Sequence, residues 1–502
     1  MKKILFLLSL ALVVNVSCSK FLEQSAQDLV RPQNIEHYKE LLRGEGYYKE
    51  IYPRGWFVDV MTDNVNLMDL VYPVNGANAI DLQSKNPYKW ASDLENESGT
   101  FTDQFFRYVY RNILAANSCL EGMDEVAEGT AQERHSLKGQ AHFIRAYGYF
   151  TLANLYAQAY NVANPQDLCV PVVTRSTPTL NGIPQATQKE VWDLISSDIE
   201  IAVEELSKIP ETNNIYEISY KAALLLASRI YLFKEDFGKS IYYAEKLLDI
   251  QPALRNISNY TGVPNTTGAS RGERAFLSYQ ANPEVLFTFG TIYNTAPTTG
   301  MLFYAEQVTF RSKVNYTISK GVPGALYDIY TANDKRRSTW FSATSGTLGV
   351  PLSKPYHSLM KFNTADGCRS THYMRTAEAY LNLSEAYARQ ATPDIAKSLE
   401  YLNTLRKNRI NGYVDMTSAN FSTPEALVDF IIEERRREFC FEEFHRWWDL
   451  RRMGQPELKH KYMAETYVLR KNDPAYVLNF PKQELENNTM LKQNPRPERL
   501  PE

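Results

Sequence analysis

Hydrophobic and polar positions follow a helical period most clearly near the C-terminal end of the chain, from Glu425 to Gly454. Apolar residues recur there at steps of three and four, which places them on one face of a helix. They are Leu427, Phe430, Ile431, Phe439, Phe441, Phe444, Trp448 and Leu450. Thr423 is suited to cap this helix and Pro424 to its first turn, while Gly454 followed by Pro456 marks its end. The pattern predicts one long scaffold helix, or two in succession, with buried aromatic residues.

Charged residues occupy many of the other positions of this segment. Glu433 and Arg437, and likewise Glu442 and Arg446, stand four residues apart with the acid first, the favoured order on a helix. We expect these charges to be solvated pairs or to form a polar network between helices. We expect no ligand to contact the segment.

A repeated pattern predicts two similar helical pairs. DFGKSIYYAEKLL, starting at Asp236, aligns with DIAKSLEYLNTLR, starting at Asp394. The helix before each copy carries a small residue and then a tyrosine three positions later: Ser228 and Tyr231, and Ser384 and Tyr387. Small and aromatic residues at these places are typical of tetratricopeptide pairs, which stack into a superhelix. The alternative is that two ordinary helical hairpins share common residues.

Further helical patterns cover Asn34 to Gly44, two stretches after Phe101, and Lys189 to Leu206, which Thr187 is placed to cap. Between helical stretches, residues 45–98 and 249–368 mix Asn, Thr, Gly and Pro with aromatic residues and short strand-like runs. The prediction is a mainly α fold, in which tetratricopeptide-like helical pairs form a superhelical scaffold with a loop-rich lobe containing short strands. We expect an N-terminal helical region (34–248), a loop-rich ligand-facing region (249–372) and a C-terminal helical region with a tail (373–502).

The first residues have the pattern of an export signal. Lys2 and Lys3 precede a short apolar run from Ile4 to Val16, and Cys18 follows Ser17. We interpret residues 1–17 as a lipoprotein signal peptide, with cleavage before Cys18, lipidation of Cys18 and a tether over 18–33; several acyl chains on one residue anchor a protein stably. The alternative is an ordinary secretory signal in which Cys18 is incidental. No later apolar run reaches about 18 residues, so we expect a soluble mature chain tethered to a membrane.

Composition removes several classes of function. The net charge is −3, without the basic excess of a nucleic-acid-binding protein. Cys119, Cys169, Cys368 and Cys440 have no zinc-site spacing. We expect Cys119 and Cys440 to be buried free thiols, and a disulfide among the four stays open.

Catalytic and metal motifs are equally scarce. There is no phosphate-binding loop, dinucleotide fingerprint, nucleophile elbow or HExxH sequence. Two E-x-x-H spacings occur, Glu442 to His445 and Glu457 to His460, but the second lies beyond the predicted helix end. We predict no metal site and no cofactor; a structural calcium ion stays open. A carboxylate pair for glycoside hydrolysis cannot be chosen among 58 acidic residues.

The residues that favour a function are aromatic and amide side chains in the two loop-rich zones. Aromatic rings can stack on sugar rings, and Asn, Asp and Arg can bond to hydroxyl groups. The candidates are Tyr72, Asn75 and Tyr88 in the first zone, and Tyr293, Tyr304, Tyr316 and Trp340 in the second. For each of them a place in the core is the alternative, and for Trp90 it is the preferred interpretation.

Several longer motifs carry a resemblance to a known family. They are FLE at Phe21, ELLRGEGYY, GQAHFIRAYGYFTLANLYAQAY, RTAEAYLNLSEAYAR, YLNTLRKNRI, ERRREFCFEEFHRWWDLRRMG and NFPKQELENNTMLKQNP. In this order they resemble the SusD/RagB family of Bacteroidetes outer-membrane lipoproteins over nearly the whole mature chain. Phe444 stands where the family usually has Gly, and the end QNPRPE lacks the usual Gly and aromatic residue.

The resemblance implies a non-enzymatic, lipid-anchored binding protein on the cell surface. Such a protein captures glycans or peptides and delivers them to a SusC-like TonB-dependent transporter that it covers. Two alternatives stay open from the residues alone: a secreted or surface hydrolase on a helical scaffold, and a tetratricopeptide adaptor without a small ligand.

Overall fold

The structure is a computed structural model that describes residues 32–67, 85–95, 101–177, 182–260, 276–277, 282–291, 316–318, 324–344, 356–359, 370–462 and 464–502. The α-helices are α2 (Ile35–Leu41), α3 (Ile51–Gly55), α4 (Phe57–Val60), α6 (Phe105–Gly122), α7 (Ala131–Tyr156), α8 (Gln188–Ser207), α9 (Tyr220–Phe233), α10 (Phe237–Ile250), α12 (Lys335–Trp340), α13 (Thr376–Arg389), α14 (Ile395–Lys407), α15 (Pro424–Phe439), α16 (His445–Arg452) and α17 (Lys482–Asn487). Short π or 3-10 turns are η1 (Leu42–Gly46), η2 (Met123–Glu125), η3 (Ser418–Asn420) and η4 (Pro474–Tyr476).

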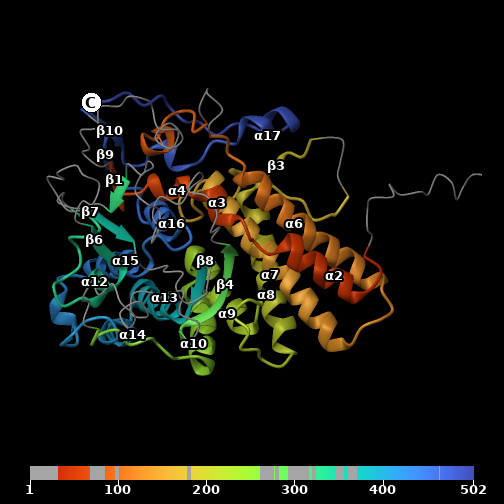
Figure 1. Cartoon of the computed structure of the whole chain (residues 1–502), viewed down its shortest axis with the longest axis horizontal. Coiled ribbons are helices and arrows are strands. Elements are labelled where there is room, and N and C mark those ends of the chain that lie inside the picture. Colours follow the sequence, from red (N-terminus) through yellow and green to blue (C-terminus); the bar gives the residue numbers. More distant parts are fainter. Residues whose placement is uncertain are drawn as a thin grey trace, which may run out of the picture.

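The long helices pack in the order of the chain. Helix α6 packs on α7, α7 on α8, α8 on α9, α9 on α10, α10 on α13, and α13 on α14 and α15. In Figure 1 this array runs from α6 and α2 at the right, through α9 and α10, to α14 and α15 at the left. The mainly helical fold with packed pairs is as predicted, and so are the caps, since Thr187 caps α8 and Thr423 caps α15.

The two repeats make similar contacts between tyrosine, lysine and glutamate. Tyr231 donates to Glu200 of α8, and Lys239 Nζ lies 2.7 Å from the same carboxylate. In the second copy Tyr387 donates to Glu245 of α10 (2.5 Å), and Lys397 Nζ lies 3.1 Å from the Tyr387 hydroxyl. Each pair therefore takes its glutamate from the helix before it, which ties neighbouring pairs together.

The small residues of the repeat make a second matching contact. Ser228 and Ser240 hydroxyls are 3.3 Å apart, as are those of Ser384 and Ser398. The position of Glu245 is taken in the second copy by Asn403. Its side-chain oxygen accepts from the Tyr413 hydroxyl (2.6 Å) and from Met416 N (3.0 Å) instead of joining another helical pair.

The strands are short, and within the described residues they form five two-stranded antiparallel sheets. The pairs are β1 (Val65–Leu67) with β5 (Tyr316–Ile318), β2 (Leu168–Pro171) with β3 (Gln185–Thr187), β4 (Val285–Thr291) with β8 (Ser370–Arg375), β6 (Phe341–Thr344) with β7 (Tyr356–Leu359), and β9 (Leu458–Tyr462) with β10 (Glu465–Leu469). The β4–β8 ribbon contacts α9, and β8 also contacts α13, so it joins the loop-rich region to the helical array.

The Glu425–Gly454 segment forms two helices because the backbone breaks between α15 and α16. Phe441 and Glu443 have φ angles of 61° and 47°, in the left-handed region that interrupts a right-handed helix. Arg229 donates to the Glu443 carboxylate (2.7 Å), and so does Tyr147 (3.0 Å). These buried contacts hold a conformation that costs on the order of 1–3 kcal/mol per residue.

This break makes one of the predicted ion pairs wrong. Glu433 and Arg437 do pair along α15. Glu442 and Arg446 do not, because the chain turns between them. Arg375 binds Glu442 (2.7 Å), and Arg446 binds Asp63 (2.7 Å).

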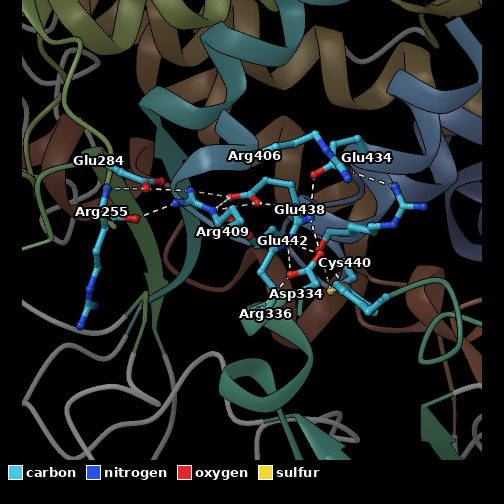
Figure 2. Close-up of polar contacts among 12 residues, drawn as sticks. Arg255, Glu284, Asp334, Arg336, Arg406, Arg409, Glu434, Glu438, Cys440 and Glu442 are labelled. Carbon is cyan, nitrogen blue, oxygen red and sulfur yellow. Dashed lines mark hydrogen bonds and ion pairs between the residues drawn. The ribbon is translucent and has the colours of Figure 1, made fainter. Parts of the chain in front are cut away.

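Most charges of α15 enter a buried network, which was the second of the two alternatives for this segment. Figure 2 shows Glu434 and Glu438 of α15 facing arginines from other parts of the chain. Glu438 accepts from Arg336 Nη1 (2.9 Å), Arg375 Nη1 (2.6 Å) and Arg409 Nη2 (2.9 Å). We name Glu284, Asp334, Arg336, Arg375, Arg409, Glu434, Glu438 and Glu442 the ionic core; each is at most 3% exposed.

The electrostatics of the ionic core depend on complete pairing. Burial alone would raise the pKa of Glu438, but the guanidiniums of Arg409, Arg375 and Arg336 outweigh it and hold the pKa well below its ordinary value. Arg375 bridges three carboxylates, those of Glu284, Glu438 and Glu442. Since removing one partner leaves an uncompensated buried charge, these side chains are structural.

Candidate ligand-binding site

A groove of about 660 Å³ lies beside the outer end of the β4–β8 ribbon. Three parts of the chain line it. They are Arg43, Tyr47 and Lys49 after α2; Asn214, Tyr216 and Glu217 of the α8–α9 connection; and Thr288, Phe289, Gly290 and Ser370 of β4 and β8.

Tyr47 connects the segment after α2 to the α8–α9 connection. Its hydroxyl donates to Gln140 of α7 (2.7 Å) and accepts from the backbone nitrogen of Ile218 (3.2 Å). Its ring lies edge-on to Phe287, with 5.9 Å between centroids. Burial, the largest effect, raises the pKa of Tyr47, so the hydroxyl stays protonated and able to donate.

The α8–α9 connection is attached to the β4–β8 ribbon by a backbone hydrogen bond. Thr288 N donates to the carbonyl of Ile215 (2.8 Å), which fixes the α8–α9 connection along β4. Tyr216, the next residue, is 51% exposed at the groove, an uncommon position for so large a ring. The amide oxygen of Asn214 accepts from Tyr216 N (3.1 Å), which leaves the amide nitrogen able to donate to a ligand.

The described residues that line the groove carry more positive than negative charge. Arg43 and Lys49 are the cations among them, and Glu217 is the one carboxylate among them. Arg43 Nη2 lies 3.4 Å from Glu217, and Gln140 also donates to Glu217 (3.2 Å). Among the residues that the structure describes, no carboxylate pairs with Lys49.

A second pocket, of about 390 Å³, lies on the other side of Arg43 and Glu217. Its charged side chains are already paired. Lys39 contacts Glu133 (2.7 Å), and Lys221 lies 3.5 Å from Glu211. This pairing makes it a less suitable place for a ligand than the groove.

Two of the residues proposed from sequence as ligand contacts are buried. Tyr88 is 1% exposed, and its ring stacks on His460 with 4.1 Å between centroids. Trp340, at the end of α12, is 0% exposed and lies near Phe276, with 5.7 Å between ring centroids. Trp90 is also fully buried and stacks on the other face of His460, which confirms its predicted place in the core.

The other proposed residues are less completely placed. Tyr316 lies in β5, opposite Leu67 of β1. Cys18, Tyr72, Asn75, Tyr293 and Tyr304 lie outside the described residues. In the sequence, Tyr293 follows the groove residue Gly290 by three positions.

Sequence reasoning did not select the groove residues. Tyr47 and Lys49 stand at the start of the loop-rich zone, and Tyr216 is a lone aromatic residue in the polar run PETNNIYE. An isolated aromatic residue in a polar loop is the one signal that could have indicated Tyr216. The contact between this loop and β4 depends on chain pairing that no local pattern reveals.

The E-x-x-H spacings are used for packing. Glu442 is bound by Arg375, and both nitrogens of His460 face carbonyl oxygens, Tyr88 O at 2.7 Å and Thr62 O at 3.0 Å. Burial lowers the pKa of His460 to about 4. Across the described part of the chain, no group of three or more His, Cys, Asp or Glu side chains is arranged to hold a metal ion. Cys119, Cys169 and Cys440 are free and buried, as predicted for Cys119 and Cys440.

The arrangement of helical pairs and short ribbons defines a SusD-like fold, and comparison with known proteins agrees. Residues 31–232 match the family model described as starch-binding and associating with the outer membrane, and residues 288–496 match that of the SusD family. The chain therefore belongs to the SusD/RagB family.

Relatives cover nearly the whole chain at low identity. A SusD-like protein of Formosa agariphila is 20% identical and covers 95% of each chain. The crystal structure of a SusD superfamily protein from Bacteroides thetaiotaomicron is 19% identical with a TM-score of 0.70, covering 92% of this chain and 100% of that one. A SusD-like carbohydrate binding protein from Bacteroides vulgatus is 20% identical with a TM-score of 0.66, covering 92% and 98%.

Membership of this family makes the chain a binding protein associated with the outer membrane, and not an enzyme. Among the described residues, no helix is both long and apolar enough to span a membrane.

Proposed function

We propose that the protein captures a glycan at the cell surface and passes it to a SusC-like TonB-dependent transporter in the outer membrane. Lipid on Cys18 anchors it there. Family membership carries the proposal, because the family model that matches residues 31–232 is described as starch-binding and associating with the outer membrane. The groove supports it, since exposed Tyr216 offers a ring for stacking beside donors on Asn214 and Lys49.

The groove marks where the ligand binds in this proposal. Tyr72, Asn75, Tyr293, Tyr304 and Tyr316 remain proposed ligand contacts on the grounds of sequence alone. Tyr88 and Trp340 are core residues. Stacking on rings held by a rigid scaffold loses little conformational entropy, which suits weak and reversible binding of long polymers.

A binding array of polysaccharides and peptides tests the ligand class. The purified protein is expected to retain one or more glycans, and Tyr216→Ala is expected to weaken that retention while the unfolding transition stays unchanged. Tyr242→Ala is a matched control, because Tyr242 is 50% exposed on α10, away from the groove. Retention of peptides alone would contradict the glycan assignment.

Labelling of intact cells tests the location. A membrane-impermeant reagent is expected to label the protein, and a large barrel protein is expected to co-purify with it. Replacement of Cys18 by Ala should release it from the membrane fraction. Recovery only from the soluble periplasm would contradict the proposal.

A further inference from the structure

The cations of the groove set it apart from a site for neutral sugars. A neutral saccharide needs rings and hydrogen-bonding groups, and the groove has these in Tyr216, Asn214 and Ser370. It also has Arg43 and Lys49, and Glu217, the one carboxylate among the described lining residues, offsets only one of these charges. A neutral ligand would leave the second cation without an opposite charge.

Arg43 and Glu217 differ from Lys49 in their surroundings. Glu217 is fixed by Gln140, whose own side chain is bonded to Tyr47 and Ser136, so its carboxylate has a structural place at the groove wall. Arg43 is 56% exposed in its side chain and meets Glu217 at 3.4 Å, a long contact that leaves other guanidinium donors to solvent. Lys49 is exposed as well, and no described carboxylate pairs with it.

We propose that the groove selects acidic saccharides, with Lys49 and Arg43 binding a carboxylate or sulfate on a sugar whose ring stacks on Tyr216. This inference rests on the proposed function and specifies its ligand class. Asn214 and Ser370 then meet the hydroxyl groups of the same saccharide. Charge-assisted hydrogen bonds are stronger than neutral ones, so the acidic group contributes both affinity and discrimination against neutral glycans.

A matched pair of ligands tests this directly. Oligogalacturonate and its carboxyl-reduced form share linkage and length and differ only in the charged group. By calorimetry the purified protein is expected to bind the acidic form about fivefold to tenfold more tightly at low salt, the range for one partly exposed ion pair and a second weaker contact. The preference should shrink as salt rises, because salt screens exposed charges.

Variants identify the side chains responsible. Lys49→Gln is expected to remove most of the preference without changing binding of the carboxyl-reduced form, and Lys49→Glu to reverse it. Lys471→Gln removes an equal charge from an exposed turn after β10 and should change nothing. Sulfated and unsulfated forms of one neutral oligosaccharide, run in parallel, distinguish a sulfate from a carboxylate as the preferred group.

The outcomes separate the two proposals. Equal binding of acidic and reduced forms, or an unchanged preference in Lys49→Gln, would overturn the acidic-saccharide inference while leaving glycan capture intact. Tighter binding of an acidic peptide such as oligoglutamate would overturn the assignment to a saccharide. Failure to bind any glycan, charged or neutral, would overturn the proposed function itself.

Discussion

The ionic core around α15 and the groove beside β4 both contain arginine and glutamate, but the charges have opposite roles. In the ionic core each carboxylate meets guanidiniums at 2.6–3.2 Å with almost no exposure to water. At the groove Arg43 lies 3.4 Å from Glu217, and both side chains are partly exposed. No carboxylate among the residues that the structure describes pairs with Lys49. Charges that are fully paired and buried stabilise one conformation, whereas hydrated charges with unused donors can exchange water for a ligand.

The largest expected effect is the loss of one carboxylate from the ionic core. Replacing Glu438 with Gln leaves Arg336, Arg375 and Arg409 short of a buried counter-charge, so unfolding free energy should fall by about 3–5 kcal/mol. Urea denaturation followed by circular dichroism measures this. Glu433→Gln on the same helix is the control, because Glu433 is 43% exposed and pairs only along α15; it should cost less than about 0.5 kcal/mol. Similar losses for both variants would mean that the ionic core is no more important than a surface pair.

Acidification should lower the free energy of unfolding through buried groups of the interior rather than through the groove residues. Burial, helped by the charge of Arg229, lowers the pKa of His372 to about 3. The unfolded chain therefore takes up a proton at this residue below its ordinary pKa near 6.5, while the folded chain does not until about pH 3. Stability is complete above pH 6.5 and falls as the pH drops toward 3.

His372→Phe checks this expectation. The new ring can keep the contacts with Phe289 and Phe444, whose centroids lie 5.1 and 5.7 Å from the imidazole. Unfolding measured between pH 7 and pH 5 should show a shallower loss in the variant. An unchanged slope would assign the acid sensitivity to other groups.

An intermediate effect is expected in the helical repeat, where the charges are half exposed. Tyr231→Phe and Tyr387→Phe each remove one hydroxyl donor to a glutamate, a loss of about 0.5–1.5 kcal/mol. Because the two sites match, the two losses should agree within about 0.5 kcal/mol and add in the double variant. Thermal unfolding of the three variants measures both points. A loss in one copy only would contradict the structural equivalence of the repeats.

The smallest effect on stability is expected at the groove. Lys49→Gln and Tyr216→Ala change exposed side chains and should alter unfolding free energy by no more than about 0.5 kcal/mol. Ligand affinity should nevertheless fall in both. A large loss of stability would show that the groove is part of the scaffold rather than a surface shaped for a ligand.

Local patterns in the sequence predicted the scaffold well. The serine and tyrosine positions of the repeat, and the caps Thr187 and Thr423, depend on neighbours within a few residues, so the sequence reveals them. The ionic core could not be predicted in detail. The carboxylates that bind Arg375 stand 63, 67 and 91 positions away from it in the sequence. The backbone break at Phe441 and Glu443 also separates charges that a continuous helix would pair.

The candidate groove was harder to predict for the same reason. Trp340 and Tyr88 were selected as aromatic residues in loop-rich zones, yet both are buried, since α12 and the His460 stack enclose them. The groove residues come from three distant parts of the chain. They meet because Tyr47 bonds to Ile218 N and because the α8–α9 connection pairs with β4. Composition did not indicate which aromatic rings reach the surface.

The glutamate that each helical pair takes from the helix before it gives the array a direction of growth. Glu200 bonds to the first pair and Glu245 to the second, while Asn403 on α14, the last helix of the second pair, accepts from Tyr413 and Met416. An extra pair, copied from α9 and α10 and inserted after Ile250, would have the Glu245 carboxylate as its acceptor. Its own copy of Glu245 would then accept from Tyr387. The same helical pair inserted after α14 would meet Asn403 in place of a carboxylate. The array is thus extensible in the middle and closed at its end, which gives protein engineers a defined site for lengthening the scaffold.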